Sequence, residues 1–273
     1  MKDILINKVL THADCDIHYW ISNRGDSPWL IFLHGAGADH EMFTEQLESV
    51  SNEFNILLWD ARGHGQSRPI GKHFSIKMIV EDLVKIMNTE RIQRATLIGQ
   101  SMGGNIAQEL AFYYPDKIEK LVLIDCTCNT RKLTRLETCY LKITPVLIRL
   151  IPWKQLVNSS VKASALTPHV QEYLRNSFKR IGKKDFVKIL LATTFCLHYE
   201  QNYQINKPLL LAYGEKDLTG NIKKIAPSWA SDEPYCTLVE IPKASHCSNQ
   251  DNPSAFNQVF LQFLNDFTSP EKT

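Results

Sequence analysis

The chain has 273 residues, 44% of them hydrophobic and 22% charged, and a formal net charge of +2. A chain of this length and composition can bury a core without disulfides or a structural metal. It has no basic run of the kind that binds nucleic acid and no apolar stretch near the roughly 20 residues of a membrane span, so we expect neither a nucleic-acid partner nor an integral membrane segment. Charges near the N-terminus interrupt any signal-peptide core, and the seven scattered cysteines favour reduced thiols, which together predict a cytoplasmic location.

Strand-like and helix-like patterns alternate along the first 125 residues. Short apolar runs that end at glycine or polar residues predict strands, and a 3.6-residue period predicts helices. The expected strands are 4–10, 17–21, 29–33, 54–59, 95–98 and 120–124, and the expected helices are 39–50, 76–89 and one that ends near 114. Such alternation is typical of βαβ units and predicts an α/β fold with a parallel sheet.

The rhythm changes between 126 and 206, where strand-like runs vanish and helical patterns take over. Pro145, Pro152 and Pro168 are expected to break these helices into short pieces. Strands and helices then resume at 208–213, 222–230, 237–241 and 253–267. We therefore expect an α/β core domain made of 1–125 and 207–273, with 126–206 as a helical insertion.

The pentapeptide Gly99-Gln100-Ser101-Met102-Gly103 matches the pattern G-x-S-x-G. It lies between the predicted strand 95–98 and a predicted helix, which is the context that a nucleophile elbow requires. The glycines allow the strand and the helix to approach closely, so the hydroxyl of Ser101 projects above the carboxyl edge of the sheet. The positive N-terminus of the following helix points at the same place. Ser101 is therefore the predicted nucleophile.

A serine hydroxyl needs a base, and the base needs an acid that orients it. His246 follows the predicted strand 237–241, and Asp217 follows the predicted strand 208–213. The chain order serine, aspartate, histidine is the order that this kind of site uses. Asp217 is the preferred acid, while Glu215 and Asp125 stay open as rivals because each also follows a predicted strand.

Acyl transfer also needs donors for the developing oxyanion. We expect the backbone N–H groups of Met102 and Ala36 to supply them, with Gly37 as the alternate to Ala36 and His34 as a brace for the loop. The glycines around Ala36 lack the lysine of a phosphate-binding loop. The cysteines and histidines show no metal-ligand spacing, so we expect neither a metal site nor a cofactor.

These segments together resemble the α/β-hydrolase superfamily, in its lid-bearing serine-hydrolase branch. The resemblance rests on five motifs in the expected order: His34-Gly35-Ala36-Gly37, Asp60-Ala61-Arg62-Gly63-His64-Gly65-Gln66-Ser67, Gly99 to Gly104, Gly214-Glu215-Lys216-Asp217 and Ser245-His246. It implies an eight-stranded, mostly parallel sheet flanked by helices, with 126–206 as a helical lid and 60–67 as a structural turn. Several lid aromatics are then expected to line an apolar acyl pocket: Tyr140, Trp153, Phe178, Phe195 and Tyr199.

The function that these residues favour is hydrolysis of a carboxylic ester of a small to medium, fairly apolar small-molecule substrate through an acyl-enzyme. One alternative is a C–C bond hydrolase or lyase for a polar carboxylate metabolite, which insertion arginines would bind: Arg131, Arg135, Arg149 and Arg175. Another is a receptor on the same fold with slow turnover. The sequence leaves the substrate's identity and the oligomeric state open.

Overall fold

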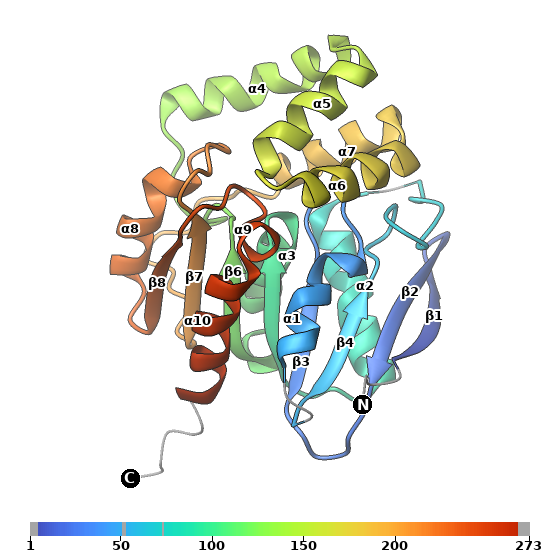
Figure 1. The fold of residues 1–273 in the computed structure, drawn as a ribbon, viewed down its shortest axis with the longest axis vertical. Coiled ribbons are helices and arrows are strands. Elements are labelled where there is room, and N and C mark those ends of the chain that lie inside the picture. The colour runs from blue at the N-terminus through green and yellow to red at the C-terminus, as the bar shows by residue number, and fades with distance from the viewer. Residues whose placement is uncertain (1–4, 51–52, 73, 267–273) are drawn as a thin grey trace.

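The computed structural model describes residues 5–50, 53–72 and 74–266, which form an eight-stranded sheet with helices on both sides (Figure 1). The strands lie in the order β1-β2-β4-β3-β5-β6-β7-β8. Their bounds are β1 Ile6–His12, β2 Cys15–Ser22, β3 Trp29–Leu33, β4 Asn55–Trp59, β5 Ala95–Gln100, β6 Ile118–Ile124, β7 Leu209–Gly214 and β8 Cys236–Ile241. Strands β3 to β8 run parallel to one another, while β2 is antiparallel to both β1 and β4.

The burial of each strand explains its sequence pattern. Every residue of β4, β5 and β7 is buried, because helices cover both faces of the parallel region, and these strands are accordingly mostly apolar. The edge strand β1 instead alternates between exposed and half-buried residues. It joins β2 through a two-residue turn at Ala13 and Asp14, whose φ angles of 45° and 62° are those of a tight hairpin.

Helices α1 Thr44–Ser49 and α10 Pro253–Asp266 pack together on one face of the sheet, and α2 Ile76–Thr89 packs beside α3 Met102–Tyr113 on the other (Figure 1). Helix α8 Ile222–Asp232 packs against β7 and β8. Three short helices complete the core: η1 His40–Phe43, η2 Pro115–Lys117 and α9 Ser248–Asp251.

Four helices of the insertion lie beyond the carboxyl edge of the sheet, above the ends of the parallel strands (Figure 1). They are α4 Arg135–Leu150, α5 Trp153–Ser164, α6 Pro168–Ile181 and α7 Lys183–Phe195. Helices α5, α6 and α7 bury apolar side chains, but α4 buries none. Packing rather than propensity holds most protein helices in place, so α4 is the least anchored of the four.

The α/β class and the eight-stranded, mostly parallel sheet are confirmed. The expected helix 39–50 is two pieces, η1 and α1, because the side chain of Asp39 caps a short 3₁₀ turn first. The expectation that Pro145 breaks a helix is wrong, since Pro145 lies within α4. Pro152 and Pro168 do stand at helix starts. Residues 4 and 267, the predicted ends of the first strand and last helix, lie outside the described residues.

Candidate active site

The strand-to-helix turn at Ser101 has the backbone geometry of a nucleophile elbow. Ser101 has φ 50° and ψ −112°, a strained conformation for a residue with a side chain. A Cβ atom on Gly103 would overlap the carbonyl group of Leu33 in β3, and one on Gly99 would overlap the backbone of Gly103. Only glycine therefore allows α3 to lie this close to β3 and β5. The turn leaves Ser101 half-buried at the start of α3, beyond the carboxyl end of β5.

The structure brings the predicted base and acid to Ser101. His246 Nε2 lies 2.9 Å from Ser101 Oγ, and His246 Nδ1 lies 3.0 Å from Asp217 Oδ2. Both His246 and Asp217 are buried. Asp217 is held in turn because its Oδ1 accepts the backbone N–H of Thr219 at 2.7 Å. The three side chains form one continuous line of hydrogen-bonding groups, from a carboxylate through an imidazole to a hydroxyl.

The charged groups around His246 shift its pKa. Burial alone would lower the pKa of His246, but its hydrogen bond to Asp217 and the negative charges of Asp217 and Asp125 outweigh burial and raise that pKa above its ordinary value. Burial, strengthened by the charge of Asp217, raises the pKa of Asp125 to about 7.

The two rival acids occupy other positions. Asp125 accepts the backbone N–H groups of Gly214 and Ser248, each at 2.8 Å, rather than a ring nitrogen. Glu215 accepts the backbone N–H of Lys243 at 2.9 Å and pairs with Lys216. Of the three candidate carboxylates, Asp217 is the one that contacts the imidazole.

The loop that carries Ala36 stands next to the elbow. Leu33 at the end of β3 pairs with Gly99 of β5, so the residues that follow each strand leave the sheet side by side. A Cβ on Gly35 would overlap the side chain of Gln100, which shows how closely the loop and the elbow approach. Gly37 has a φ of 86°, a conformation that glycine adopts without strain. This arrangement puts the backbone of Ala36 at the same edge of the sheet as Ser101.

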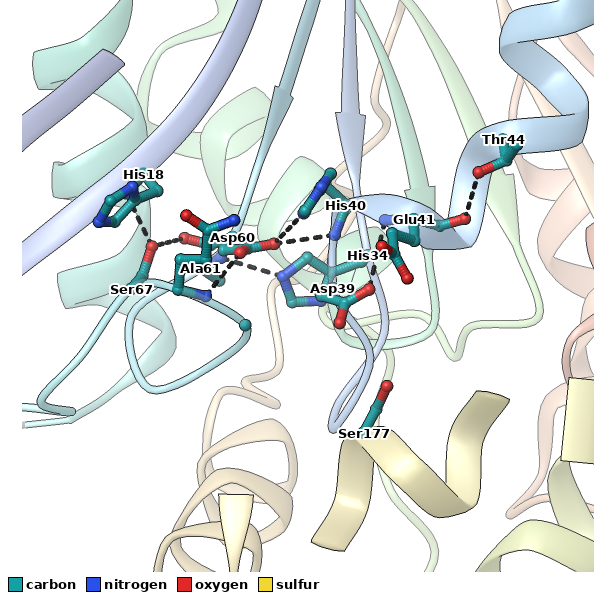
Figure 2. Close-up of polar contacts among 12 residues, drawn as sticks. His18, His34, Asp39, His40, Glu41, Thr44, Asp60, Ala61, Ser67 and Ser177 are labelled. Atoms are coloured by element: carbon teal, nitrogen blue, oxygen red, sulfur yellow. Dashed lines mark hydrogen bonds and ion pairs between the residues drawn. The ribbon is translucent and has the colours of Figure 1, made fainter. Parts of the chain in front are cut away.

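His34 braces this loop from below, as predicted. Its Nε2 accepts the backbone N–H of Ala61 at 3.0 Å (Figure 2). Its Nδ1 lies 2.9 Å from the carbonyl oxygen of Gly35. Burial lowers the pKa of His34, and it lowers the pKa of the adjacent His64 to about 3. Both rings are therefore neutral at neutral pH and act through hydrogen bonds rather than through charge.

Asp60 is the centre of the polar cluster beneath the loop (Figure 2). Its side chain accepts the backbone N–H of His40 at 2.9 Å and that of Gln66 at 2.7 Å, and its Oδ1 lies 2.8 Å from His40 Nδ1. Burial would raise the pKa of Asp60, but the hydrogen bond from His40 and its charge lower that pKa to about 2. The ionised carboxylate ties the turn after β4 to the segment that follows the Ala36 loop.

Two residues that the sequence analysis missed hold the loop of His246. Gln100, the second residue of the pentapeptide, donates from Nε2 to the carbonyl oxygen of His246 at 2.6 Å. Asp251 accepts the backbone N–H of Ser245 at 2.9 Å, and it also accepts the backbone N–H groups of Leu166 and Thr167 in the insertion. The position of Gln100 within the motif was a usable signal, whereas nothing local distinguishes Asp251 from a helix-capping residue.

A cavity of about 590 Å³ opens at Ser101 and His246. This volume is typical of a small-molecule site. Its other lining residues come from α3, from the segment between β6 and α4, from α4, from the end of α7, and from the loop after β7 and the start of α8. Among them are Asn105, Leu136, Tyr140, Leu141, Thr194 and Ile222.

The structure brings one of the predicted pocket aromatics, Tyr140, to this cavity. Phe178 is elsewhere because it packs against Gly37 and Phe186, and Trp153 packs against the same Phe186 ring at 5.5 Å between centroids. Phe195 lines a second cavity.

The ring centroid of the remaining pocket candidate, Tyr199, lies 5.8 Å from Lys132 Nζ. None of the insertion arginines proposed for carboxylate binding is among the described residues that line the Ser101 cavity.

The described residues contain no group of three or more His, Cys, Asp or Glu side chains able to hold a metal ion. They also contain no helix with the length and apolar character needed to cross a membrane.

Comparisons with known proteins agree with the geometry. A family model described as alpha/beta hydrolase fold matches residues 28–139. The chain is 23% identical to 3-oxoadipate enol-lactonase 2 of Acinetobacter baylyi, covering 94% of this chain and 96% of the relative. It is 27% identical to a 2-hydroxy-6-oxononadienedioate/2-hydroxy-6-oxononatrienedioate hydrolase of Burkholderia vietnamiensis, covering 95% and 94%.

A solved thermophilic esterase from Thermogutta terrifontis superposes with a TM-score of 0.81 at 20% identity, covering 97% of this chain and 99% of that one. The strand order, the elbow at Ser101 and the family match agree that the chain has the α/β-hydrolase fold.

Proposed function

We propose that this chain is a serine hydrolase that cleaves a carboxylic ester of a small to medium, fairly apolar substrate through an acyl-enzyme. The observation that carries the proposal is the line of contacts from Asp217 through His246 to Ser101, with distances of 3.0 and 2.9 Å. Hydroxyl, imidazole and carboxylate in hydrogen-bond contact are the arrangement that turns a serine into a nucleophile.

In the proposed mechanism, Ser101 Oγ attacks the ester carbonyl while His246 Nε2 takes its proton. Asp217 accepts the Nδ1–H of His246, which fixes the tautomer and stabilises the imidazolium. The backbone N–H groups of Met102 and Ala36 bind the oxyanion. His246 then gives its proton to the leaving alcohol, and a water activated by the same ring hydrolyses the acyl-enzyme.

The cavity at Ser101 supports an apolar substrate. Leu136, Leu141 and Ile222 line it, and its volume of about 590 Å³ suits a small to medium ester. We assign the insertion 126–206 the role of a lid, since its helix α4 contributes Leu136 and Tyr140 to the wall of the cavity. The relatives support the reaction class, because an enol-lactonase and an esterase, as their names state, both act on esters.

A second candidate is a C–C bond hydrolase for a carboxylate metabolite. Lys224 lines the cavity and offers a cation for such a substrate. The Burkholderia relative is named for an oxo-dienedioate substrate. The ester reading is preferred because the cavity wall from α4 is mostly apolar.

The test is kcat/KM on p-nitrophenyl esters from acetate to palmitate, for wild type and Ser101→Ala. Ser248→Ala is a matched control, because Ser248 is buried two residues after His246 and does not line the Ser101 cavity. We expect activity in wild type and in the control and none in Ser101→Ala. Turnover by Ser101→Ala at the wild-type rate would overturn the proposal. Activity confined to an oxo-dienoate substrate would select the C–C hydrolase, and stoichiometric acylation without turnover would select a slow receptor.

A further inference from the structure

A second cavity, of about 900 Å³, lies on the other side of α7 and shares no lining residue with the cavity at Ser101. One face of α7 forms its long wall, through residues spaced along the whole helix: Lys183, Lys184, Val187, Lys188, Leu191, Ala192 and Phe195. The start of α2 and the end of α3 form the opposite side, with Phe74, Ile76 and Tyr113. The wall runs for 12 residue steps, which at 1.5 Å each is about 18 Å.

The two ends of this second cavity differ in charge. Five cationic side chains line it: Arg149, Lys183 and Lys184 where α7 begins, Lys188 in the second turn of α7, and Lys77 in the first turn of α2. Within the described part of the chain, none of them forms an ion pair with a carboxylate. Two donate to backbone carbonyl groups instead, Lys183 to Arg149 at 2.8 Å and Lys188 to Gly71 at 3.2 Å. The positive end of the α7 dipole adds to the same field.

The other end of the second cavity is apolar and aromatic. Leu191 and Ala192 line it as buried residues, and Phe195 and Tyr113 line it with 67% and 52% of their surface exposed. The carboxylate at this end, Glu109, is buried and already bonded to His198 at 3.0 Å and to Asn129 at 2.7 Å. Exposed aromatic side chains beside buried apolar ones are typical of a ligand-binding groove.

The whole insertion shares this positive charge. Residues 126–206 hold 13 of the chain's 31 Lys and Arg residues but only 4 of its 29 Asp and Glu residues, a net charge of +9, which leaves −7 for the rest of the chain. An anion approaching the molecule is therefore attracted to this side.

We propose that the second cavity binds a single-chain amphiphile with an anionic head, such as a long-chain carboxylate. The head lies among Arg149, Lys183 and Lys184 at the start of α7, and the alkyl chain runs along α7 toward Phe195. A chain with one tail fits because the groove follows one helix, and a volume of about 900 Å³ is within the range of small-molecule sites. This site is independent of the proposed chemistry at Ser101.

The test is isothermal titration calorimetry of the full chain carrying Ser101→Ala with laurate, lauryl phosphate and lauryl alcohol, each below its micellar concentration. We expect one bound laurate or lauryl phosphate per chain and at least about tenfold weaker binding of the alcohol. Equally tight binding of the alcohol, or no binding of either anion, would overturn the proposal. The tighter of the two anions identifies the head group.

Two matched pairs of variants locate the bound ligand. Lys183→Glu with Lys184→Glu should weaken laurate at least about tenfold, whereas Lys162→Glu with Lys179→Glu, which changes the net charge equally, should change it less than about twofold. Equal weakening by both pairs would mean a general charge effect and would contradict the site.

Phe195→Asp in the second cavity should abolish laurate binding, and Tyr140→Asp in the Ser101 cavity should preserve it. These two aromatics are similarly exposed, 67% and 69%, so neither change disturbs a core. The reverse pattern would assign the ligand to the Ser101 cavity and overturn the inference.

Discussion

Replacing Gly103 with alanine tests whether the contact between α3 and β3 sets the position of Ser101. The new Cβ would lie 2.5 Å from the carbonyl carbon of Leu33 and 3.0 Å from its Cβ. Carbon atoms in contact are about 3.5 to 4.0 Å apart. Leu33 cannot yield, because β3 is hydrogen-bonded to β4 on one side and β5 on the other. Helix α3 must therefore move away by about 1 Å, and Ser101 moves with its first turn.

The size of the effect follows from this displacement. Overpacking costs about 1 to 3 kcal/mol when side chains can adjust, and more when backbone atoms collide. Alanine returns about 1 kcal/mol through its higher helix propensity. We expect Gly103→Ala to lower the free energy of unfolding by about 2 to 4 kcal/mol. If Ser101 is the nucleophile, a shift of about 1 Å should also lower kcat/KM about 100-fold.

Urea unfolding and ester kinetics measure the two effects. Gly25→Ala is the control, because its Cβ would meet nothing within 4 Å and its φ of 71° imposes strain alone. That strain costs about 1 to 2 kcal/mol, far from the site. A Gly103→Ala protein that is more stable than Gly25→Ala, or that keeps wild-type kcat/KM, would refute the reasoning.

Three further predictions concern the charges of the site and its supports. Asp217→Asn should lower kcat by roughly 10⁴-fold with little change in melting temperature. In wild type, kcat/KM should rise with pH through a midpoint above 6.5, because Asp217 raises the pKa of His246. A midpoint below 6.5 would contradict this prediction. Burial lowers the pKa of His64 to about 3. The contribution of neutral His64 to the free energy of unfolding is therefore complete above its unfolded pKa of about 6.5 and is lost as pH falls toward 3, up to about 4 to 5 kcal/mol. In urea unfolding from pH 7 to pH 4, His64→Gln should lose stability less steeply than wild type, and equal slopes would contradict this prediction. Arg62 and Asp82 form a fully buried bidentate pair, with Nε and Oδ2 2.6 Å apart. Chemical denaturation should show that Arg62→Ala lowers the free energy of unfolding by about 3 to 5 kcal/mol, and that Arg62→Met with Asp82→Leu recovers much of this loss. A double variant no more stable than Arg62→Ala would contradict this account.

The sheet and the elbow could be predicted because their signals are local. A strand buried on both faces has to be a short apolar run, and the predicted strand 29–33 coincides with β3. A strand-to-helix turn this tight has to carry glycine at 99 and 103, because a Cβ at either position would overlap backbone. The order of strands then puts Asp217 and His246 at the same edge as Ser101.

The pocket aromatics could not be predicted because their partners are distant in sequence. Helical periodicity indicates that Phe178 is buried, but it does not indicate that Gly37 and Phe186 are what it packs against. The prediction that Pro145 breaks a helix is wrong for a related reason. Proline usually ends a helix by removing a donor and crowding the preceding turn, yet α4 continues for five residues beyond it, to Leu150. Local pattern shows which residues avoid water and leaves open which cavity they line.

The choice between Asp217 and Asp125 rests on what each carboxylate is free to accept. Asp125 lies at the end of β6, and its two oxygens accept the N–H groups of Gly214 and Ser248. One of those residues ends β7, and the other follows His246 by two positions. Asp125 therefore joins the two segments that carry the proposed acid and base, and it acts on the imidazole through the backbone and through its charge. Asp217 keeps one oxygen for Thr219 and the other for the ring, which is the division that an orienting acid requires.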